Sequence, residues 1–405
     1  MSPAPLSISL RPGHPDFLDL PWDLPFSHWP HHCARIEELP RGLSRHPVVF
    51  VNYGGVIYAL KELPQDLAEK EYNLLLRIEE LHIPAVTPIG HAHAKTAQSR
   101  TSVLITRYLD RSLPYRSLFM SSSLVRYRQH LLDAIAGLLV QLHLVGVYWG
   151  DCSLSNTLFR RDAGALQAYL VDAETAETYT DRFPPELRYQ DLVIMEENIN
   201  GDLLDLETAD LLSQGVPISD TGAYIRLRYQ RLWEEITHED IITPGEHYRI
   251  QERIRALNAL GFSVGEVELA VTENGDQLRL RVAITDRNFH RDQLQGLTGL
   301  DVEEMQARLM MNEIQEFKAT LSHNNNRSTP LSVAAYHWLE NVYRPIVKQI
   351  QQLTDQNTAP AEMYCQILEH KWYLSEQARR DVGHQAAAED FLYRFGKENV
   401  DHLTV

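Results

Sequence analysis

Apolar and polar positions along the first 171 residues predict, in order, a hairpin, a helix, a strand, a long helix and a second hairpin. Two short apolar runs, 48–51 and 56–60, flank an Asn-Tyr-Gly-Gly segment, and Asn and Gly favour the tight turn of a hairpin. A helix is expected over about 66–81 and a strand over 102–108. The second hairpin turns at about 162–164. This order of elements indicates an α+β domain.

The stretch 131–149 is the longest apolar one in the chain. Asp133, Gln141 and His143 interrupt it, and its apolar residues recur at helical spacing. A buried core helix therefore explains the stretch better than a membrane span does.

The first thirty residues have another character, because they are rich in Pro and aromatic residues. Pro disfavours helix, so we expect an extended arm that docks its aromatic rings on the body.

Beyond about residue 240 a second kind of organisation begins. A helix with Ile250, Ile254 and Leu257 on one face is expected to end at Leu260-Gly261. A hairpin that folds about Asn274-Gly275 follows it. That turn pairs Val271 with Leu278 and sets Glu268 opposite Arg281. The later segments have helical periodicity. An Asp301-x-x-Glu304 capping box is expected to begin a helix that extends to about 321, and another helix is expected from about 332.

Composition narrows the function classes. The chain has 405 residues, with 38 Lys and Arg against 55 Asp and Glu, a formal net charge of −17. Proteins that bind nucleic acid or anionic lipid need positive surface, so neither class of partner is expected. Three scattered cysteines are too few for a disulfide framework or a thiolate metal cage. No secretory signal pattern is visible at the N-terminus, and we expect a cytoplasmic protein.

Two carboxylates and an amide stand where phosphoryl transfer needs them. Asp151 follows the long apolar helix, and Asn156 comes five residues later, just before a strand. Asp172 ends the next strand. An Asp can accept a hydroxyl proton, while an Asn and a second Asp can hold a metal that bridges phosphates. Either Asp alone would be read as a turn or cap residue, but the three together favour the catalytic interpretation.

A candidate ion pair precedes this set. Lys61 ends the second apolar run, and Glu71 lies in the middle of the apolar stripe of the following helix. A carboxylate at such a position is costly unless it meets a cation. We expect Lys61 to be that cation. The alternative is that Glu71 lies at the edge of the stripe and reaches solvent.

These motifs resemble those of protein kinases. Lys61 resembles the lysine of the third strand, and Glu71 the glutamate of the helix that follows. Residues 142–156 resemble the catalytic loop, and Asp172 the metal-binding aspartate. The resemblance is strongest to the atypical branch, the lipopolysaccharide kinase, Rio and Bud32-like groups, whose loop carries Gly before the Asp, as Gly150 does here. The whole chain resembles a bacterial family that joins such a kinase-like half to a C-terminal domain of unknown function.

The resemblance implies an enzyme that uses ATP and Mg²⁺. It implies that Asp151 positions and deprotonates the acceptor hydroxyl. Asn156 and Asp172 would then hold Mg²⁺, and Lys61 would contact the phosphates while Glu71 orients it.

The resemblance also places the nucleotide. Tyr108 and Leu109 would offer hinge backbone to adenine, and Thr106 would lie behind the pocket. Gly42 and Ser44, in a short loop that precedes Lys61, would contact phosphates, although a single glycine makes this loop thin.

Other features depart from the kinase pattern. Trp149 stands where most kinases have a histidine that supports the loop, and Asp172-Ala173-Glu174 replaces Asp-Phe-Gly.

The chain has 18 histidines, and His91-x-His93 and His31-His32-Cys33 suggest a metal site. Neither has a third ligand at recognisable spacing, so we interpret them as scattered surface histidines.

We therefore predict a two-lobed protein-kinase-like α+β fold with an additional C-terminal α+β domain. The expected parts are an arm at 1–30, an N-lobe at 31–108, a C-lobe at 109–238 and the C-terminal domain at 239–405. The expected activity is phosphoryl transfer from ATP to a hydroxyl of a protein Ser or Thr, a sugar or a lipid-linked acceptor. The alternative is a pseudokinase-type scaffold that binds nucleotide or protein without catalysis. The C-terminal domain is expected to serve acceptor or partner recognition.

Overall fold

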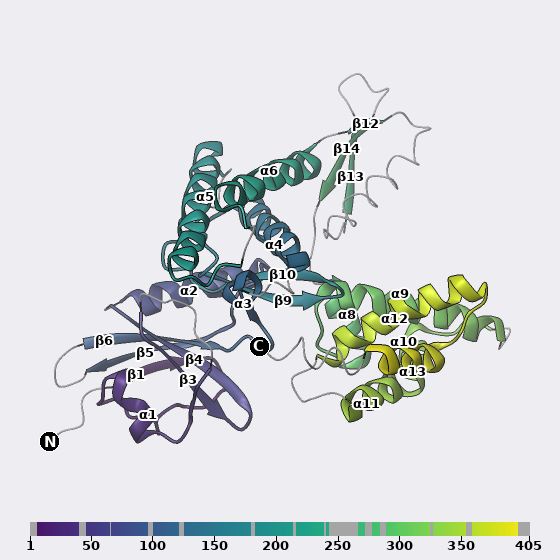
Figure 1. Ribbon diagram of the computed structural model, residues 1–405, viewed down its shortest axis with the longest axis horizontal. Coiled ribbons are helices and arrows are strands. Elements are labelled where there is room, and N and C mark those ends of the chain that lie inside the picture. Colours follow the sequence, from purple (N-terminus) through teal and green to yellow (C-terminus); the bar gives the residue numbers. More distant parts are fainter. Residues whose placement is uncertain are drawn as a thin grey trace. The chain divides into compact units, whose positions relative to one another are not determined.

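The computed structural model describes the chain except residues 1–5, 40–45, 65, 96–99, 121–124, 180–182, 214–215, 239, 243–265, 272–277, 284–288, 325–326, 354–358 and 396–405. The chain forms two compact units (Figure 1). Unit 1 comprises Met1–Arg160 and Gln167–Trp233. Unit 2 comprises Arg161–Leu166 and Glu234–Val405.

Unit 1 begins with a six-stranded antiparallel sheet in the order β1-β5-β6-β4-β3-β2. Its strands are β1 (Ser7–Leu10), β2 (Ile36–Glu37), β3 (Val48–Tyr53), β4 (Val56–Leu63), β5 (Pro88–Lys95) and β6 (Arg100–Arg107). The first predicted hairpin is confirmed as β3 and β4, and the predicted single strand as β6. Strand β5 was not predicted, because its residues alternate between small Ala and polar His and so lack a strong apolar alternation.

The aromatic residues of the N-terminal arm are buried against this sheet, as expected. Phe17, Trp22, Phe26 and Trp29 belong to one core cluster with residues of β3 to β6. The expectation of a merely extended arm is incomplete, however, because Ser7–Leu10 joins the sheet as its edge strand β1 beside β5. Two short turns of helix follow, η1 (Phe26–His28) and α1 (Trp29–His32).

Helices make up most of the remainder of unit 1. They are α2 (Leu67–Glu80), α3 (Tyr115–Met120), α4 (Val125–Leu144), α5 (Pro185–Thr208) and α6 (Ile218–Thr237). Short strands accompany them: β7 (Leu113–Pro114), β8 (Val147–Tyr148), β9 (Thr157–Asp162), β10 (Ala165–Leu170) and β11 (Glu177–Thr178). Leu131, Ile135, Leu138 and Leu142 of α4 are fully buried, so the long apolar stretch is a core helix. Among the described residues, no helix combines the length and the apolar character that crossing a membrane would need.

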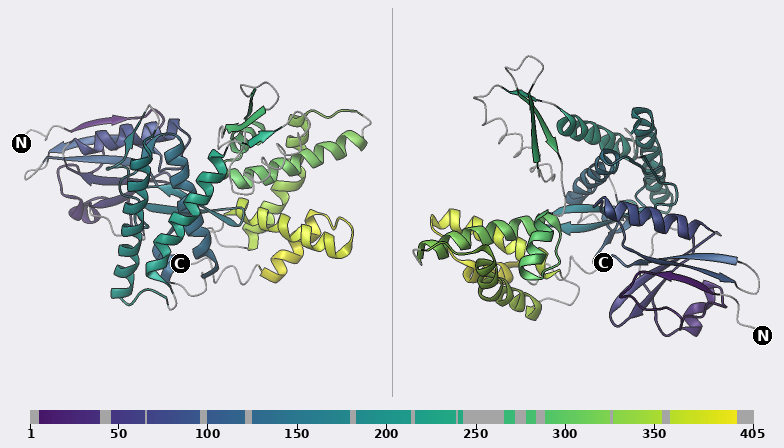
Figure 2. Two further views of the ribbon diagram at one scale, coloured as in Figure 1. Left: turned by 90° about the horizontal axis from the view of Figure 1, so that it is seen from above. Right: turned by 180° about the vertical axis from the view of Figure 1, so that it is seen from behind.

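Helices α5 and α6 lie side by side in unit 1 (Figures 1 and 2). The guanidinium of Arg226 on α6 lies 3.2 Å from the carboxylate of Glu196 on α5. At Gly222 the two helices approach so closely that a Cβ would lie 3.0 Å from the backbone of Glu196. Glycine is therefore required at this crossing.

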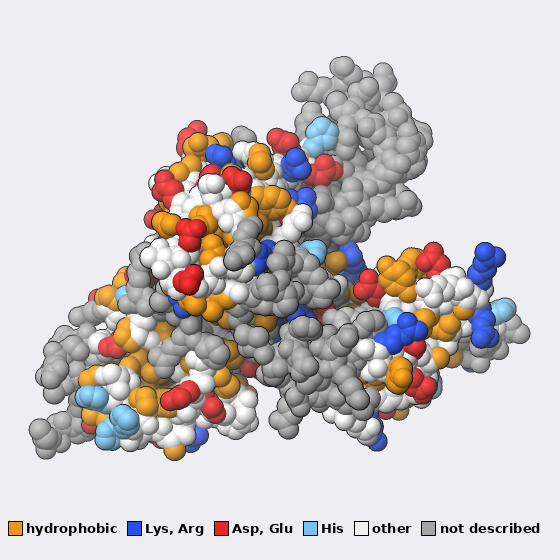
Figure 3. Space-filling view, in the orientation of Figure 1, with side chains coloured by type: hydrophobic (Ala, Val, Ile, Leu, Met, Phe, Trp, Pro, Cys, Tyr) orange, Lys and Arg blue, Asp and Glu red, His pale blue; other side chains and the backbone are white. Residues whose placement is uncertain are grey.

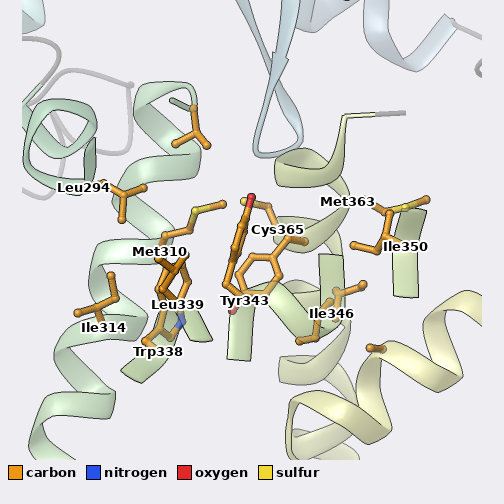
Figure 4. Packing of buried hydrophobic residues seen from close by; sticks show 14 of the residues in the cluster. Leu294, Met310, Ile314, Trp338, Leu339, Tyr343, Ile346, Ile350, Met363 and Cys365 are labelled. Carbon is orange, nitrogen blue, oxygen red and sulfur yellow. The ribbon is translucent and has the colours of Figure 1, made fainter. Parts of the chain in front are cut away.

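Unit 2 is mostly helical in its described part. Its helices are α8 (Phe289–Thr298), α9 (Glu304–Asn324), α10 (Leu331–Trp338), the π-helical turn η3 (Leu339–Tyr343), α11 (Arg344–Leu353), α12 (Pro360–Ala378) and α13 (His384–Phe395). Their apolar faces meet in a core around Trp338, Tyr343 and Tyr364 (Figure 4). Buried Glu313 accepts the indole N–H of Trp338 at 2.8 Å and also bonds His384 and the Tyr364 hydroxyl.

The strands of unit 2 form one small sheet in the order β12-β14-β13, with bounds Asp240–Ile242, Leu278–Ala283 and Glu266–Val271. The predicted register is confirmed, since Val271 pairs with Leu278 and Glu268 with Arg281. The turn at Asn274-Gly275 and the helix expected near 250–257 lie outside the described residues. Both kinds of element are present, as the α+β expectation requires, but the core of the unit is made by helices.

The turn between β9 and β10 clusters with unit 2, although its flanking residues belong to unit 1. The carboxylate of Asp162 accepts the backbone N–H groups of Met305 at 3.1 Å and Gln306 at 2.9 Å, in the first turn of α9. Glu362 accepts the N–H groups of Ala163 at 2.7 Å and Gly164 at 2.9 Å. Reciprocal bonds thus fix a helix start and a hairpin turn.

The expected capping box of α9 is wrong. The helix begins at Glu304, and Asp162, distant in sequence, supplies the capping carboxylate. Asp301 instead accepts the guanidinium of Arg291 at 2.8 Å. The carboxylate of Glu304 accepts the N–H of Arg291 at 3.0 Å rather than one at its own helix start. A long-range carboxylate has replaced the local one, which spacing alone could not indicate.

Charge is mixed on the helical surface of unit 2. On the face that Figure 3 shows, Lys and Arg side chains are interspersed with Asp and Glu.

Asp162 should make stability depend on pH. Burial raises its pKa to about 8, and Glu303 and Glu362 add to the effect against the two backbone N–H groups. Because the folded-state pKa lies above the unfolded one, this group stabilises the fold at acidic pH, and the contribution is lost as pH rises through about 8. Asp162→Asn should therefore flatten the fall in melting temperature of the full chain between about pH 5 and 8. Asp301→Asn, at an exposed carboxylate, is the control; an unchanged slope in Asp162→Asn would contradict the assignment.

Candidate functional site

An ion-pair network joins the sheet, α2 and the segment after β10. The ammonium of Lys61 on β4 lies 3.2 Å from the carboxylate of Glu71 on α2 and 2.7 Å from that of Asp172. The Glu71 side chain is 1% exposed, so it lies within the apolar stripe as the sequence indicates, and Lys61 is its partner. The alternative in which Glu71 reaches solvent is wrong. Glu71 also accepts the backbone N–H of Ala173 at 3.1 Å.

Burial and charge act in opposite directions in this network. Burial lowers the pKa of Lys61, but the carboxylates of Glu71 and Asp172 outweigh it and raise that pKa. Burial raises the pKa of Glu71 to about 7, with Asp172 adding to the rise and Lys61 opposing it. Lys61 therefore stays a cation, and its ammonium is the group of this network that can contact an anionic ligand.

The loop after β8 holds Asp151 between two amides. The Nδ2 group of Asn156 donates to Asp151 Oδ2 at 3.1 Å, and that of Asn198 donates to Oδ1 at 2.8 Å. The backbone N–H of Val171 donates to the carbonyl of Asn156 at 3.1 Å. This bond ties the loop to the end of β10, just before Asp172. The three predicted polar residues of this region therefore lie on connected segments of one site.

Trp149 occupies the position of the expected histidine and supports the loop by other bonds. It is fully buried, and its indole N–H donates to the carbonyl of Asp172 at 2.9 Å. The hydroxyl of Thr175 donates to the Trp149 carbonyl at 2.9 Å. The indole thus connects the residue before Gly150 to the backbone of Asp172.

Asp191 on α5 holds the start of the loop by hydrogen bonds. Asp191 was not among the site residues predicted from the sequence. It is fully buried, and its carboxylate accepts the backbone N–H groups of Trp149 and Gly150, each at 2.9 Å. The same carboxylate bonds the ring of His143 at 3.0 Å. Gly150 adopts a φ of +76°, and a Cβ there would lie 2.9 Å from the Tyr148 ring, so only glycine fits.

His143 is held in one tautomer. Burial lowers its pKa, although Asp191 opposes the shift, so the ring is neutral. Its Nε2 then donates to Asp191, and its Nδ1 accepts the hydroxyl of Tyr229 at 2.8 Å. His143 therefore interrupts the apolar stretch because both of its ring nitrogens make buried hydrogen bonds, to Asp191 and Tyr229.

One face of α5 contacts the whole loop. Asp191 bonds its start, Asn198 bonds Asp151, and Asp202 accepts the N–H of Ser155 at 3.1 Å. These residues are spaced by seven and four positions, which is one side of a helix. That spacing among buried apolar residues was the signal that could have found them.

The predicted nucleotide contacts are only partly described. Gly42 and Ser44 lie outside the described residues. Thr106 is buried on β6 opposite Ala59 of β4. The backbone N–H of Tyr108 donates to the carbonyl of Ile57 at 3.0 Å, so it is already used within the protein. The carbonyl of Leu109, the next residue, accepts the N–H of Ser112 at 3.3 Å, and its role as a hinge contact stays a prediction.

Comparison with known proteins identifies both halves of the chain. Residues 57–213 match the lipopolysaccharide kinase (Kdo/WaaP) family. Unit 1 carries a Kdo/WaaP-family domain. Residues 231–395 match the domain of unknown function DUF4032. The predicted resemblance to a lipopolysaccharide kinase joined to a C-terminal domain of unknown function is thereby confirmed.

The Kdo/WaaP-family domain contains every described residue of the candidate site, from Lys61 to Asn198. No curated protein matches the chain. Among solved structures, one described as WaaP in complex with acyl carrier protein is similar at 18% identity with a TM-score of 0.33. That match covers 56% of this chain and 83% of the other.

Removing the Asp191 carboxylate should unfold the loop that carries Gly150 and Asp151. Asp191→Ala leaves the N–H groups of Trp149 and Gly150 buried without an acceptor, and each such group costs about 1–3 kcal/mol. We therefore expect the free energy of unfolding to fall by about 2–6 kcal/mol in urea titrations followed by tryptophan fluorescence. Glu197→Gln, at an exposed position of the same helix, is the control. A loss no larger than that of the control would show that Asp191 does not support the loop.

Proposed function

We propose that the Kdo/WaaP-family domain transfers the γ-phosphoryl group of ATP to a hydroxyl, with Mg²⁺ as the metal. The observation that carries this proposal is the ammonium of Lys61 shared between Glu71 and Asp172, beside a loop that holds Asp151. Phosphoryl transfer needs a fixed cation for the phosphates, a carboxylate for the metal and a carboxylate for the hydroxyl. One connected set of side chains offers all three.

The donor set fits a hard divalent ion. Mg²⁺ prefers oxygen ligands, and Asp172 offers a carboxylate that is about a quarter exposed. Asn156 uses its Nδ2 group to bond Asp151, which directs its carbonyl oxygen elsewhere. When bound, Mg²⁺ would neutralise charge on the phosphate oxygens. Asp172 and Asn156 are the residues that would hold it.

Asp151 is suited to accept the hydroxyl proton. Each oxygen of its carboxylate takes one amide N–H, from Asn156 or Asn198. A carboxylate oxygen has two lone-pair positions, so acceptor capacity remains on both. The two amides fix the plane of the carboxylate, and a fixed base positions the attacking oxygen in line with the phosphate. Lys61 would hold the phosphates, with Glu71 orienting its ammonium.

The scaffold alternative now has weaker support. Its sequence arguments were Trp149 and the single glycine of the loop before Lys61. The Trp149 indole bonds the Asp172 carbonyl, so its presence is compatible with an ordered loop. The acceptor stays open among a protein Ser or Thr, a sugar and a lipid-linked hydroxyl, and DUF4032 is proposed to recognise that acceptor or a partner.

Two single substitutions should separate nucleotide binding from transfer. Asp172→Asn should remove the Mg²⁺-dependent part of the thermal shift that ATP causes, because it weakens the metal ligand set. Asp151→Asn should keep that shift and lower transfer from γ-labelled ATP to water or protein by about 10²–10⁴-fold, because only the base is lost. Full transfer by Asp151→Asn would remove its role as base. If ATP and Mg²⁺ cause no thermal shift in the wild-type chain, the phosphotransferase proposal is wrong and the scaffold alternative is favoured.

Lys61 and Glu71 should behave as one unit. Lys61→Ala and Glu71→Ala should each weaken ATP binding by about tenfold, and the double variant should be little worse than either, since the two side chains act through one contact. Isothermal titration with the four proteins of the cycle measures this coupling. Additive losses would mean that the pair is structural only.

A further inference from the structure

Helix α2 and strand β5 bring Glu69 to two histidines that lie more than twenty residues further along the sequence. Glu69 lies in the first turn of α2, and His91 and His93 lie two residues apart on β5. One ligand atom from each of the three lies within 4.8 Å of the other two. The sequence offered the two histidines without a third ligand, and the fold supplies it.

The two histidines face α2 because of the strand's alternation. Ala92 and Ala94, between and beyond them, are buried in the core on the opposite face, with Phe17 and Trp29. Residues at i and i+2 share a face, so both imidazoles project from the other side of the sheet. Their ring centroids are 5.5 Å apart, and Tyr72 of α2 lies 5.4 Å from the His91 ring.

One ring nitrogen of this cluster is buried without a hydrogen-bond partner in the described part of the chain. It is the Nδ1 atom of His91. This ring nitrogen, a second imidazole and a carboxylate are together the kinds of donor that divalent transition metals bind.

We propose that Glu69, His91 and His93 bind a divalent transition-metal ion of the Zn²⁺ class. Two imidazoles and one carboxylate are a known ligand type for Zn²⁺, with water as the fourth ligand. Ligand atoms at about 2.1 Å from a tetrahedral ion lie about 3.4 Å from one another, so the observed spacing needs only side-chain rotation. The half-buried histidines and the exposed Glu69 leave the ion reachable from solvent.

The site connects the first turn of α2 to the sheet. Glu71, two residues after Glu69, points into the network of Lys61. The bound ion therefore stabilises the turn that carries Glu71, independently of any nucleotide. The N–H of Ala68 in the same turn lies near the hydroxyl of Ser102 on β6, at 3.4 Å, so the turn has one contact with the sheet already. The metal adds a second contact, to β5.

The test is a Zn²⁺ titration of the metal-stripped full chain by calorimetry. Wild type should bind one Zn²⁺ tightly, Glu69→Gln should weaken that binding by about tenfold or more, and the double variant His91→Gln/His93→Gln should lose it. The control double variant His31→Gln/His32→Gln removes two exposed histidines and should bind as wild type does.

Equal affinity and stoichiometry in the His91→Gln/His93→Gln variant and in wild type would overturn the proposal, as would loss of binding only in the control. If the double variant does not fold, Glu69→Gln decides, because Glu69 is exposed and its change leaves the core intact. Co²⁺ then replaces Zn²⁺, and an unaltered visible spectrum in Glu69→Gln would exclude the site. Zn²⁺ should also slow amide hydrogen exchange in the first turn of α2 in wild type and not in Glu69→Gln.

Discussion

One buried carboxylate organises the candidate site. Asp191 lies within apolar surroundings, where an ion is costly unless it is fully hydrogen-bonded, and it receives two backbone N–H groups and an imidazole. These bonds place the start of the loop on α5. Gly150 can then take its left-handed conformation, and Asp151 enters reach of Asn156 and Asn198. Without this carboxylate, the N–H groups of Trp149 and Gly150 and the ring of His143 would all lose a hydrogen-bond partner. The conformation of the loop therefore depends on Asp191.

Trp149 shows how a different residue can serve the same contact. A histidine in this position would offer a polar ring to the backbone, whereas the indole offers one N–H and a large apolar surface. Here the N–H reaches the carbonyl of Asp172, and the rest of the ring is fully buried. The loop is thus held by packing as well as by a hydrogen bond. A departure from the usual motif is accordingly no measure of lost function when the bond it supplied is still made.

Local pattern predicted much of the fold and of the site. The β3–β4 hairpin, α2 with its buried Glu71, α4 and the register of β13 with β14 follow from periodicity and turn chemistry. The missed features depend on contacts distant in sequence. Asp191 and Asn198 act on a loop about forty residues earlier, and Asp162 begins a helix that lies 143 residues later. Glu69 meets His91 only because the sheet places β5 beside α2. Such pairings are decided by topology, which one sequence without relatives does not contain.

The turn at 161–166 has a consequence for the order of folding during synthesis. The residues that flank this turn belong to unit 1. The backbone N–H of Ala163, however, is bonded by the carboxylate of Glu362, which lies 199 positions further along the chain. Asp162 gains its partners when α9 leaves the ribosome, whereas the N–H groups of Ala163 and Gly164 remain in water until α12 does. The Kdo/WaaP-family domain can therefore collapse early, but its last hairpin stays unfinished until nearly the whole chain has been made. Contacts of such length close slowly, and a chain that is interrupted before α12 would expose an unsatisfied turn to degradation.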